Sequence, residues 1–389
     1  MRLLALALIL AGCAKKTTPP PEPVVEPNTE QDTEPDTEAP VCWTAPSHPD
    51  RVRYAVISHP FAGPGENANA FEVLSLSADG TLEPTGTHFE MGRNTDGSIV
   101  FSPDGHLGVA VQADGSLGLF TLDDDGTVTV IADHLGLGQF YAKHVSIDPV
   151  DGTLWVVDGN WPNNGGGVYR LPLNCHTLET GRPERVLQSK LAVSLILDGS
   201  GPDILVASAI AGSIPGDDIH LLELGPIQHY GSGQNLDDKA IRSGVARAGH
   251  WLLVADNSAF SGIPHRVAIS ELHDDHVSLH ATFEIEDPFD ITISPFGNAA
   301  LVTSGIRNAV IRLAFDGTEW TKEERVSRPR LPGRLVTISH PPLTGRVFVA
   351  ENLGVRQLQF DPDGSVSEVG YLDFGNSESH VVGGIGVQP

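Results

Sequence analysis

The sequence predicts an all-β protein, a seven-bladed β-propeller built from four-stranded blades, and three observations carry this prediction. The chain of 389 residues contains 42 glycines and 29 prolines, which favour frequent chain reversals over long helices. A short apolar strand that ends in a Pro/Gly turn recurs along the chain at a nearly constant spacing. Further strand-like segments, separated by turns, follow each copy except the last.

The recurring strand has seven copies along the chain. Its clear and degenerate copies are IVFSPDG (99–105), VSIDPVDG (145–152), LILDGSG (195–201), VARAGH (245–250), ITISPFG (291–297), VTISHPPLTG (336–345) and GIGVQP (384–389). The markers Ile99, Val145, Leu195, Val245, Ile291, Val336 and Ile385 are spaced at about 45 to 50 residues, a period typical of propeller blades.

The remaining strands of a blade are clearest after the first copy. LGVAVQA (107–113), LGLFTL (117–122) and TVTVIA (127–132) are rich in apolar and β-branched residues, and turns bearing Gly or Asp separate them. The blade that precedes this one begins with RVRYAVIS (51–58), which resembles a second strand. We therefore predict that GIGVQP (384–389) supplies its inner strand, so that the C-terminal strand pairs with the N-terminal blade and closes the ring.

The N-terminal segment predicts export and lipidation. Residues 1–12 form an apolar run too short to span a bilayer and are interpreted as a signal peptide. They end in Leu-Ala-Gly before Cys13, which resembles a bacterial lipobox and makes Cys13 the expected lipidation site. Ala14 favours the outer membrane by resemblance to known sorting signals. The alternative is an ordinary secretory signal followed by a chance cysteine.

The next segment is interpreted as a spacer between anchor and domain. Residues 13–41 hold the lipidated cysteine and a Pro-, Glu- and Thr-rich tether with almost nothing to bury, which predicts disorder. Residues 42–389 form the propeller. Cys42 and Cys175 would face an oxidising compartment after export, and we predict that they form a disulfide. Two buried or free thiols are the alternative.

Net charge limits the class of partner. The formal charge is -26, which repels phosphate backbones and argues against nucleic acid as a partner. It also favours a soluble monomer. The predicted location is the bacterial cell envelope, as an outer-membrane lipoprotein that is periplasmic or surface-exposed and that contacts the membrane through its lipid anchor.

We predict a cationic ligand site on one face of the ring, formed by loops that enter the inner strands and loops between second and third strands. The inner-strand entries contribute Lys143, His144, Arg242 and Arg334, and such cations would concentrate a small anion. The loops after the second strands add Asp158, Asn160, Asp256, Asn257, Glu351 and Asn352. The alternative interpretation is a set of solvated loop residues in which Lys and Arg balance neighbouring acids.

Residues 96–126 and 141–160 resemble the lactonase-type propellers, which include the 6-phosphogluconolactonase family and the YVTN-repeat proteins. The resemblance covers roughly residues 51–389 and implies a propeller fold and, in some members, lactone hydrolysis. It aligns His144 with the Arg-His entry of that family, where this chain has Lys143-His144. The family's acidic-Asn pair is altered to Asp158-Gly159-Asn160 and retained as Glu351-Asn352.

Other motifs predict no metal site and no cofactor. His273–His276 contains metal-ligand residue types but lies where a hairpin tip is expected. The sequence has no Gly-x-Ser-x-Gly elbow, no His-Glu-x-x-His and no Cys-x-x-Cys-His, which disfavours a serine hydrolase, a zincin and a covalent cytochrome.

Two functional hypotheses follow from these patterns. The favoured one is a membrane-tethered binding or scaffold module that recognises an envelope protein, peptide or glycan, since no complete catalytic motif is present. The alternative is a lactonase-like hydrolase that acts on a small anionic lactone. In that alternative His144 is the general base, Asp158 assists it, and Arg242 and Arg334 stabilise negative charge.

Overall fold

The computed structural model describes most of the predicted propeller. The described residues are 42–43, 52–60, 70–92, 97–159, 166–189, 191–197, 203–207, 218–224, 227–236, 241–257, 265–375 and 381–389. The predicted signal peptide, the lipidation site Cys13 and the tether lie outside them. None of the described residues forms a helix, so this part of the chain holds no helix that could cross a membrane.

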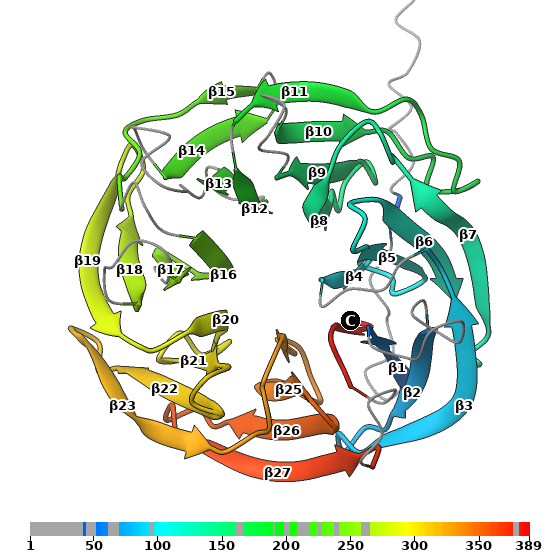
Figure 1. The fold of residues 1–389 in the computed structure, drawn as a ribbon. Coiled ribbons are helices and arrows are strands. Elements are labelled where there is room, and N and C mark those ends of the chain that lie inside the picture. Colours follow the sequence, from blue (N-terminus) through cyan, green and yellow to red (C-terminus); the bar gives the residue numbers. More distant parts are fainter. Residues whose placement is uncertain are drawn as a thin grey trace, which may run out of the picture. The chain divides into compact units, whose positions relative to one another are not determined.

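The strands form seven antiparallel sheets of four strands each, arranged as blades around a ring (Figure 1). From the ring axis outward, blade 1 holds β28 (Ile385–Val387), β1 (Arg53–His59), β2 (Ala70–Leu76) and β3 (Leu82–Glu90); blade 2 holds β4 (Ile99–Phe101), β5 (Leu107–Val111), β6 (Leu117–Leu122) and β7 (Val128–Leu135); blade 3 holds β8 (Ala142–Ile147), β9 (Leu154–Asp158), β10 (Gly167–Leu171) and β11 (Glu184–Gln188). Blade 4 holds β12 (Ala192–Ile196), β13 (Asp203–Ala207), β14 (Ile219–Leu224) and β15 (Ile227–His229); blade 5 holds β16 (Ile241–Ala248), β17 (Trp251–Asn257), β18 (Arg266–Leu272) and β19 (Val277–Glu284). Blade 6 holds β20 (Pro288–Ile293), β21 (Ala299–Ser304), β22 (Ala309–Phe315) and β23 (Trp320–Ser327); blade 7 holds β24 (Leu335–Thr337), β25 (Arg346–Glu351), β26 (Gly354–Phe360) and β27 (Val366–Asp373).

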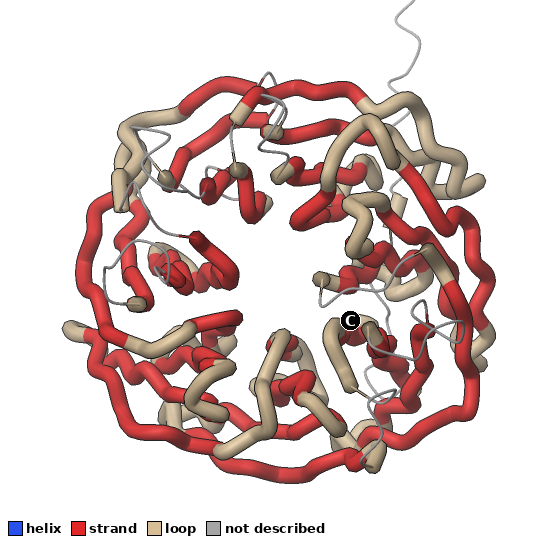
Figure 2. Tube along the Cα trace, viewed as in Figure 1, coloured by secondary structure: helices blue, strands red, loops and turns tan. Residues whose placement is uncertain are grey.

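The predicted fold class is confirmed. The seven repeat markers fall in the seven inner strands β28, β4, β8, β12, β16, β20 and β24. Strands and loops alternate around the whole ring in Figure 2. His273–His276 lies in the turn between β18 and β19, as the hairpin interpretation expected.

Burial explains which strand takes which place in a blade. The middle strands are apolar on both faces, and every residue of β5 and β6 is buried. The outermost strands β7 and β27 instead alternate between exposed and half-buried positions, because only one face of each packs inward. The described residues form seven buried clusters, and each lies between two adjacent blades. The core is therefore a closed ring of blade interfaces.

The C-terminal strand closes this ring as predicted. β28 pairs antiparallel with β1, with Val56 opposite Gly386. Gln388 is buried behind this pairing: its Oε1 accepts a hydrogen bond from the Tyr54 N–H at 3.0 Å, and its Nε2 donates to the Gly105 carbonyl of blade 2 at 2.7 Å. The two ends of the propeller sequence are thus held to each other and to the next blade.

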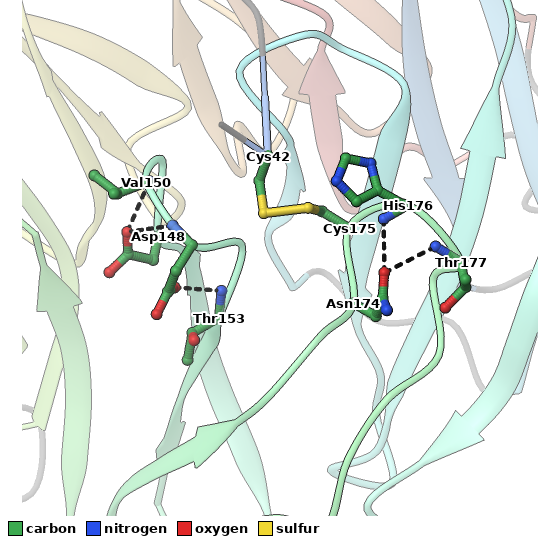
Figure 3. Close-up of a disulfide and its surroundings, with 9 residues drawn as sticks. Cys42, Asp148, Val150, Thr153, Asn174, Cys175, His176 and Thr177 are labelled. Carbon is green, nitrogen blue, oxygen red and sulfur yellow. Dashed lines mark hydrogen bonds between the residues drawn. A yellow bond between two sulfur atoms is a disulfide. The ribbon is translucent and has the colours of Figure 1, made fainter. Parts of the chain in front are cut away.

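The predicted disulfide between Cys42 and Cys175 is present, with Cα atoms 5.5 Å apart (Figure 3). Cys175 lies in the turn between β10 and β11, and the Asp148–Thr153 turn is nearby in the same view. Trp43, the residue after Cys42, is buried in the cluster between blades 2 and 3. The disulfide therefore fastens the start of the described chain to blade 3.

Candidate functional site

Bulges occur at the start of the inner strands of four successive blades, 3 to 6. The pairing register shifts between Ala142 and His144 in β8, between Ala192 and Ser194 in β12, between Arg242 and Val245 in β16, and between Pro288 and Ile291 in β20. An extra residue in a strand redirects its neighbours and is frequent beside functional sites. These bulges place polar residues such as Lys143, Ser243 and Asp290 at the ends of the strands nearest the ring axis.

His144 follows the bulge in β8 and shares a face of the strand with Ser146. The imidazole Nε2 lies 3.2 Å from Ser146 Oγ, and that hydroxyl donates to the Leu195 carbonyl of blade 4 at 2.9 Å. The hydroxyl has one proton, so it must accept the bond from His144. In the neutral imidazole Nε2 then carries the proton, and Nδ1 keeps the lone pair that a general base needs.

The surroundings of His144 favour this neutral form. Burial, followed by the positive charge of Arg334, lowers the pKa of His144 to about 4. The imidazole is therefore unprotonated at neutral pH.

Arg334 contacts residues of blades 5 and 6. Its guanidinium lies 3.7 Å from the Asp290 carboxylate, 5.1 Å from the centre of the Phe289 ring, and 3.5 Å from the Ser243 carbonyl. Burial raises the pKa of Asp290, whose carboxylate also accepts the Leu335 N–H at 2.8 Å. The Arg334 side chain is about one-quarter exposed, so a positive charge in a fixed position can meet a small anion.

A cavity of about 640 Å³ lies beside His144. Its walls come from the inner strands of blades 2, 3 and 4, from the turns that follow them, from Asp203 at the start of β13 and from Pro389 after β28. They include Val100, His144, Ser146, Ile147, Val150 and Ile196. Val150 is 74% exposed, so the cavity opens where these turns meet solvent. Its size is in the usual range of small-molecule sites.

The predicted acidic ligands Asp158, Asp256 and Glu351 make buried contacts within the protein. A buried polar residue ends the second strand of several blades and binds the loop that enters the inner strand. Asp158 accepts the Tyr141 N–H at 2.9 Å, Ser304 donates to the Glu286 carbonyl, and Glu351 accepts the Arg330 N–H. His59 meets the Val381 carbonyl in the same way at 3.2 Å. These contacts fix the loops around the candidate site.

Arg242 and Asp256 belong to a buried ionic cluster. The Arg242 guanidinium is fully buried and lies 3.1 Å from Asp218 and 3.5 Å from Asp256, and Asp256 also pairs with Arg266 at 2.9 Å. In this conformation Arg242 faces protein carboxylates. Arg242 and Arg334 were predicted to belong to one cationic site. In the structure the Arg242 side chain is fully buried, whereas the Arg334 side chain is partly exposed, and the two have different partners.

The other predicted ligand residues have a variety of partners. Lys143 is exposed, with its ammonium 4.9 Å from the centre of the Tyr141 ring. Asn257 donates to Asp287 at 2.8 Å. The Asn352 backbone N–H donates to the Arg330 carbonyl at 2.8 Å. Asn160 lies outside the described residues.

Among the described contacts, His144 and Asp158 do not form a hydrogen bond with each other. His144 meets Ser146, whereas the Asp158 carboxylate accepts N–H groups of Tyr141 and, at 3.2 Å, Gly166. Sequence reasoning missed Ser146 and the cavity. The period of two along β8 places residues 144 and 146 on one face and was the available clue to Ser146.

Among the described residues, no three His, Cys, Asp or Glu side chains are grouped so as to hold a metal ion.

Comparison with known proteins identifies the fold. No protein-family model and no curated protein matches the chain. A periplasmic gluconolactonase of Pseudomonas aeruginosa superimposes with a TM-score of 0.62 at 15% identity, over 87% of this chain and 99% of that one. A putative 6-phosphogluconolactonase of Bacteroides fragilis gives 0.58 at 12% identity, over 88% and 99%. The predicted resemblance to lactonase-type propellers is confirmed for the fold.

Proposed function

We propose that this chain, which shares the propeller fold of the gluconolactonase structures, hydrolyses a small lactone that carries or develops negative charge. The observation that carries the proposal is a neutral histidine, His144, beside a cavity of ligand size and under the influence of the Arg334 cation. The names of the two similar structures support the same reaction class.

His144 would act as the general base in this reaction. Its Nδ1 takes a proton from water while the water oxygen attacks the lactone carbonyl carbon. The carbonyl oxygen becomes an oxyanion, which Arg334 stabilises by its charge. When the carbonyl re-forms, the ring C–O bond breaks and the leaving oxygen takes the proton back from the imidazolium. The product is the hydroxy acid, so one water is consumed and no other reactant is needed.

Asp158 contributes to this mechanism through structure. Its carboxylate holds the backbone at Tyr141, directly before β8, and so fixes the bulge from which His144 projects. We assign it as a positioning residue. Arg242 has the same kind of role in blade 5, since its charge is balanced by Asp218 and Asp256.

Lactone hydrolysis by the purified chain tests the proposal. Titration of released acid at constant pH, with glucono-δ-lactone and its 6-phosphate as substrates, should show a rate above the spontaneous one. His144→Gln should lower kcat by about 100-fold or more, the usual contribution of a general base. His88→Gln is the matched control, because His88 is exposed on the outer strand β3. A rate that is equal in the wild type and in His144→Gln would rule out this role.

A binding role without catalysis remains the second proposal. It is favoured because Asp158, Asp256 and Glu351 bind other groups of the protein. His144 has no carboxylate partner among its described contacts. In this version the envelope location, the lipid anchor at Cys13 and the tether position the propeller for a protein, peptide or glycan. Ligand-dependent stabilisation of the chain by the hydroxy acid or by an envelope glycan, with no acid release from any lactone, would support it.

A further inference from the structure

We infer that the cavity below His144 selects lactones with an uncharged aliphatic substituent, so that the lactone ring lies at His144 and Ser146 and the substituent runs along β8 toward Val150. This inference rests on the proposed function and names its substrate class. It is carried by the chemistry of the cavity walls, which differs between the two ends.

The end of the cavity at His144 and Ser146 is polar. His144 and Ser146 are adjacent on one face of β8 and are joined by a hydrogen bond, and Ser146 is fixed in turn by the Leu195 carbonyl. These groups suit one reacting carbonyl and one water. Outside His144 and Ser146 the described lining residues add Ser102, Asp148 and Asp203 but no cationic or amide side chain, so they offer few donors to a chain of sugar hydroxyls.

Aliphatic side chains make up much of the rest of the cavity wall, beside the acids Asp148 and Asp203. Val100 from blade 2, Ile147 from blade 3 and Ile196 from blade 4 are only partly buried by the protein and face the cavity. Val150 continues this wall to solvent and is 74% exposed. Apolar side chains with this arrangement gain from covering by an apolar ligand group.

Charge excludes an anionic substituent at the aliphatic end. Asp148 and Asp203 belong to the cavity walls, and the Asp148 carboxylate accepts the Val150 N–H at 2.8 Å. A phosphate or carboxylate placed there would face both acids, whereas a hydrocarbon chain meets no such repulsion. The cation Arg334 acts at the other end, on His144. The two ends therefore favour opposite parts of one amphipathic lactone.

The experiment measures hydrolysis of γ-lactones whose linear alkyl substituent lengthens from methyl to octyl. We expect kcat/KM to rise about three- to fourfold for each methylene that enters the cavity, mainly through a lower KM. Val150→Asp should flatten this dependence on chain length. Val369→Asp is the matched control, because Val369 is exposed on the outer strand β27, and it should keep the wild-type slope.

A binding measurement separates this inference from the proposed function. The apolar fluorophore N-phenyl-1-naphthylamine should bind the wild-type chain and be displaced by the octyl lactone, and Val150→Asp should weaken both effects. Probe binding and displacement without any lactone turnover would overturn the hydrolase and keep the aliphatic site. His144-dependent hydrolysis of sugar lactones, with no binding or hydrolysis of the alkyl series, would overturn the aliphatic site and keep the hydrolase. A flat chain-length series, or equal slopes in Val150→Asp and Val369→Asp, would also overturn it.

Discussion

At the scale of single residues, the local environment decides the charge of His144. An imidazole in water has a pKa near neutrality, but burial and the Arg334 charge lower the pKa of His144 to about 4. The sequence identified His144 as a candidate base, and its protonation state follows from burial and then from the charge of Arg334.

This environment predicts a pH dependence of stability. As pH falls from 6.5 toward 4, the unfolded chain takes up a proton on His144 that the folded chain does not. Folding stability therefore decreases with falling pH in this window, by up to about 3 kcal/mol from this group. Urea titrations of the wild type and of His144→Gln at pH 7.5 and 4.5 measure it. The wild type should lose more stability than the variant, and equal losses would contradict the assignment.

The same environment sets the pH dependence of activity. Near neutral pH the His144 imidazole stays uncharged, so its protonation should not change the rate of the proposed hydrolysis. The rate should decline only as pH approaches 4, where the imidazole becomes charged. The pH profile of kcat/KM, corrected for spontaneous hydrolysis, measures this. A decline centred near 6.5 would show that the imidazole titrates as if it were in water.

At the scale of elements, the second strands of blades 3, 6 and 7 end in a polar residue that binds the entry loop of the same blade. The residues Asp158, Ser304 and Glu351 serve this purpose in blades 3, 6 and 7. In the sequence Asp158 and Glu351 resemble ligands, because an acidic residue at a strand end beside a loop is typical of both roles. Their backbone N–H partners show the structural role.

Glu351 allows this element-scale role to be tested with a close control. Its carboxylate is buried and pairs with the Arg330 N–H and with Arg356 at 2.9 Å, while the half-exposed Glu368 binds the same Arg356 at 2.6 Å. Glu351→Gln should lower the free energy of unfolding by about 2–4 kcal/mol, because a buried acceptor is replaced by an amide that cannot satisfy both partners. Glu368→Gln should cost less than about 1 kcal/mol. Chemical denaturation measures both, and similar losses would contradict the role of Glu351.

At the scale of the whole molecule, stability depends on closure of the ring. β28 joins the C-terminal residues to β1, and the buried Val382 and Ile385 pack in the cluster between blades 7 and 1. A propeller without this strand would expose an edge of β1 and open one of its seven blade interfaces. The disulfide between Cys42 and Cys175 adds a second long-range connection.

Deletion of residues 381–389 tests the closure. It removes two buried aliphatic side chains, each worth about 2–5 kcal/mol, together with the strand pairing. We expect a large fall in the melting temperature or a loss of cooperative unfolding. Calorimetry measures both. Gln388→Ala keeps the strand but leaves the Tyr54 N–H without its partner, and it should cost about 1–3 kcal/mol. A deletion variant that melts within a degree or two of the intact chain would refute the closure.

The sequence by itself determined the architecture of this protein. Strand order, blade number and ring closure were predicted, because a repeat reports its own period and each blade buries the same apolar pattern. The pairing of Cys42 with Cys175 was predicted separately, from the expected export and from the two cysteines that remain after Cys13. The tertiary structure alone decided which polar residues face a cavity and which face protein. Arg242 and Arg334 occupy similar places in the repeat, yet Arg242 is buried between two carboxylates and Arg334 is partly exposed near His144. The physical reason is that each of these arginines has a partner from another blade, Asp218 of blade 4 for Arg242 and Asp290 of blade 6 for Arg334, at a distance in sequence that no local pattern records.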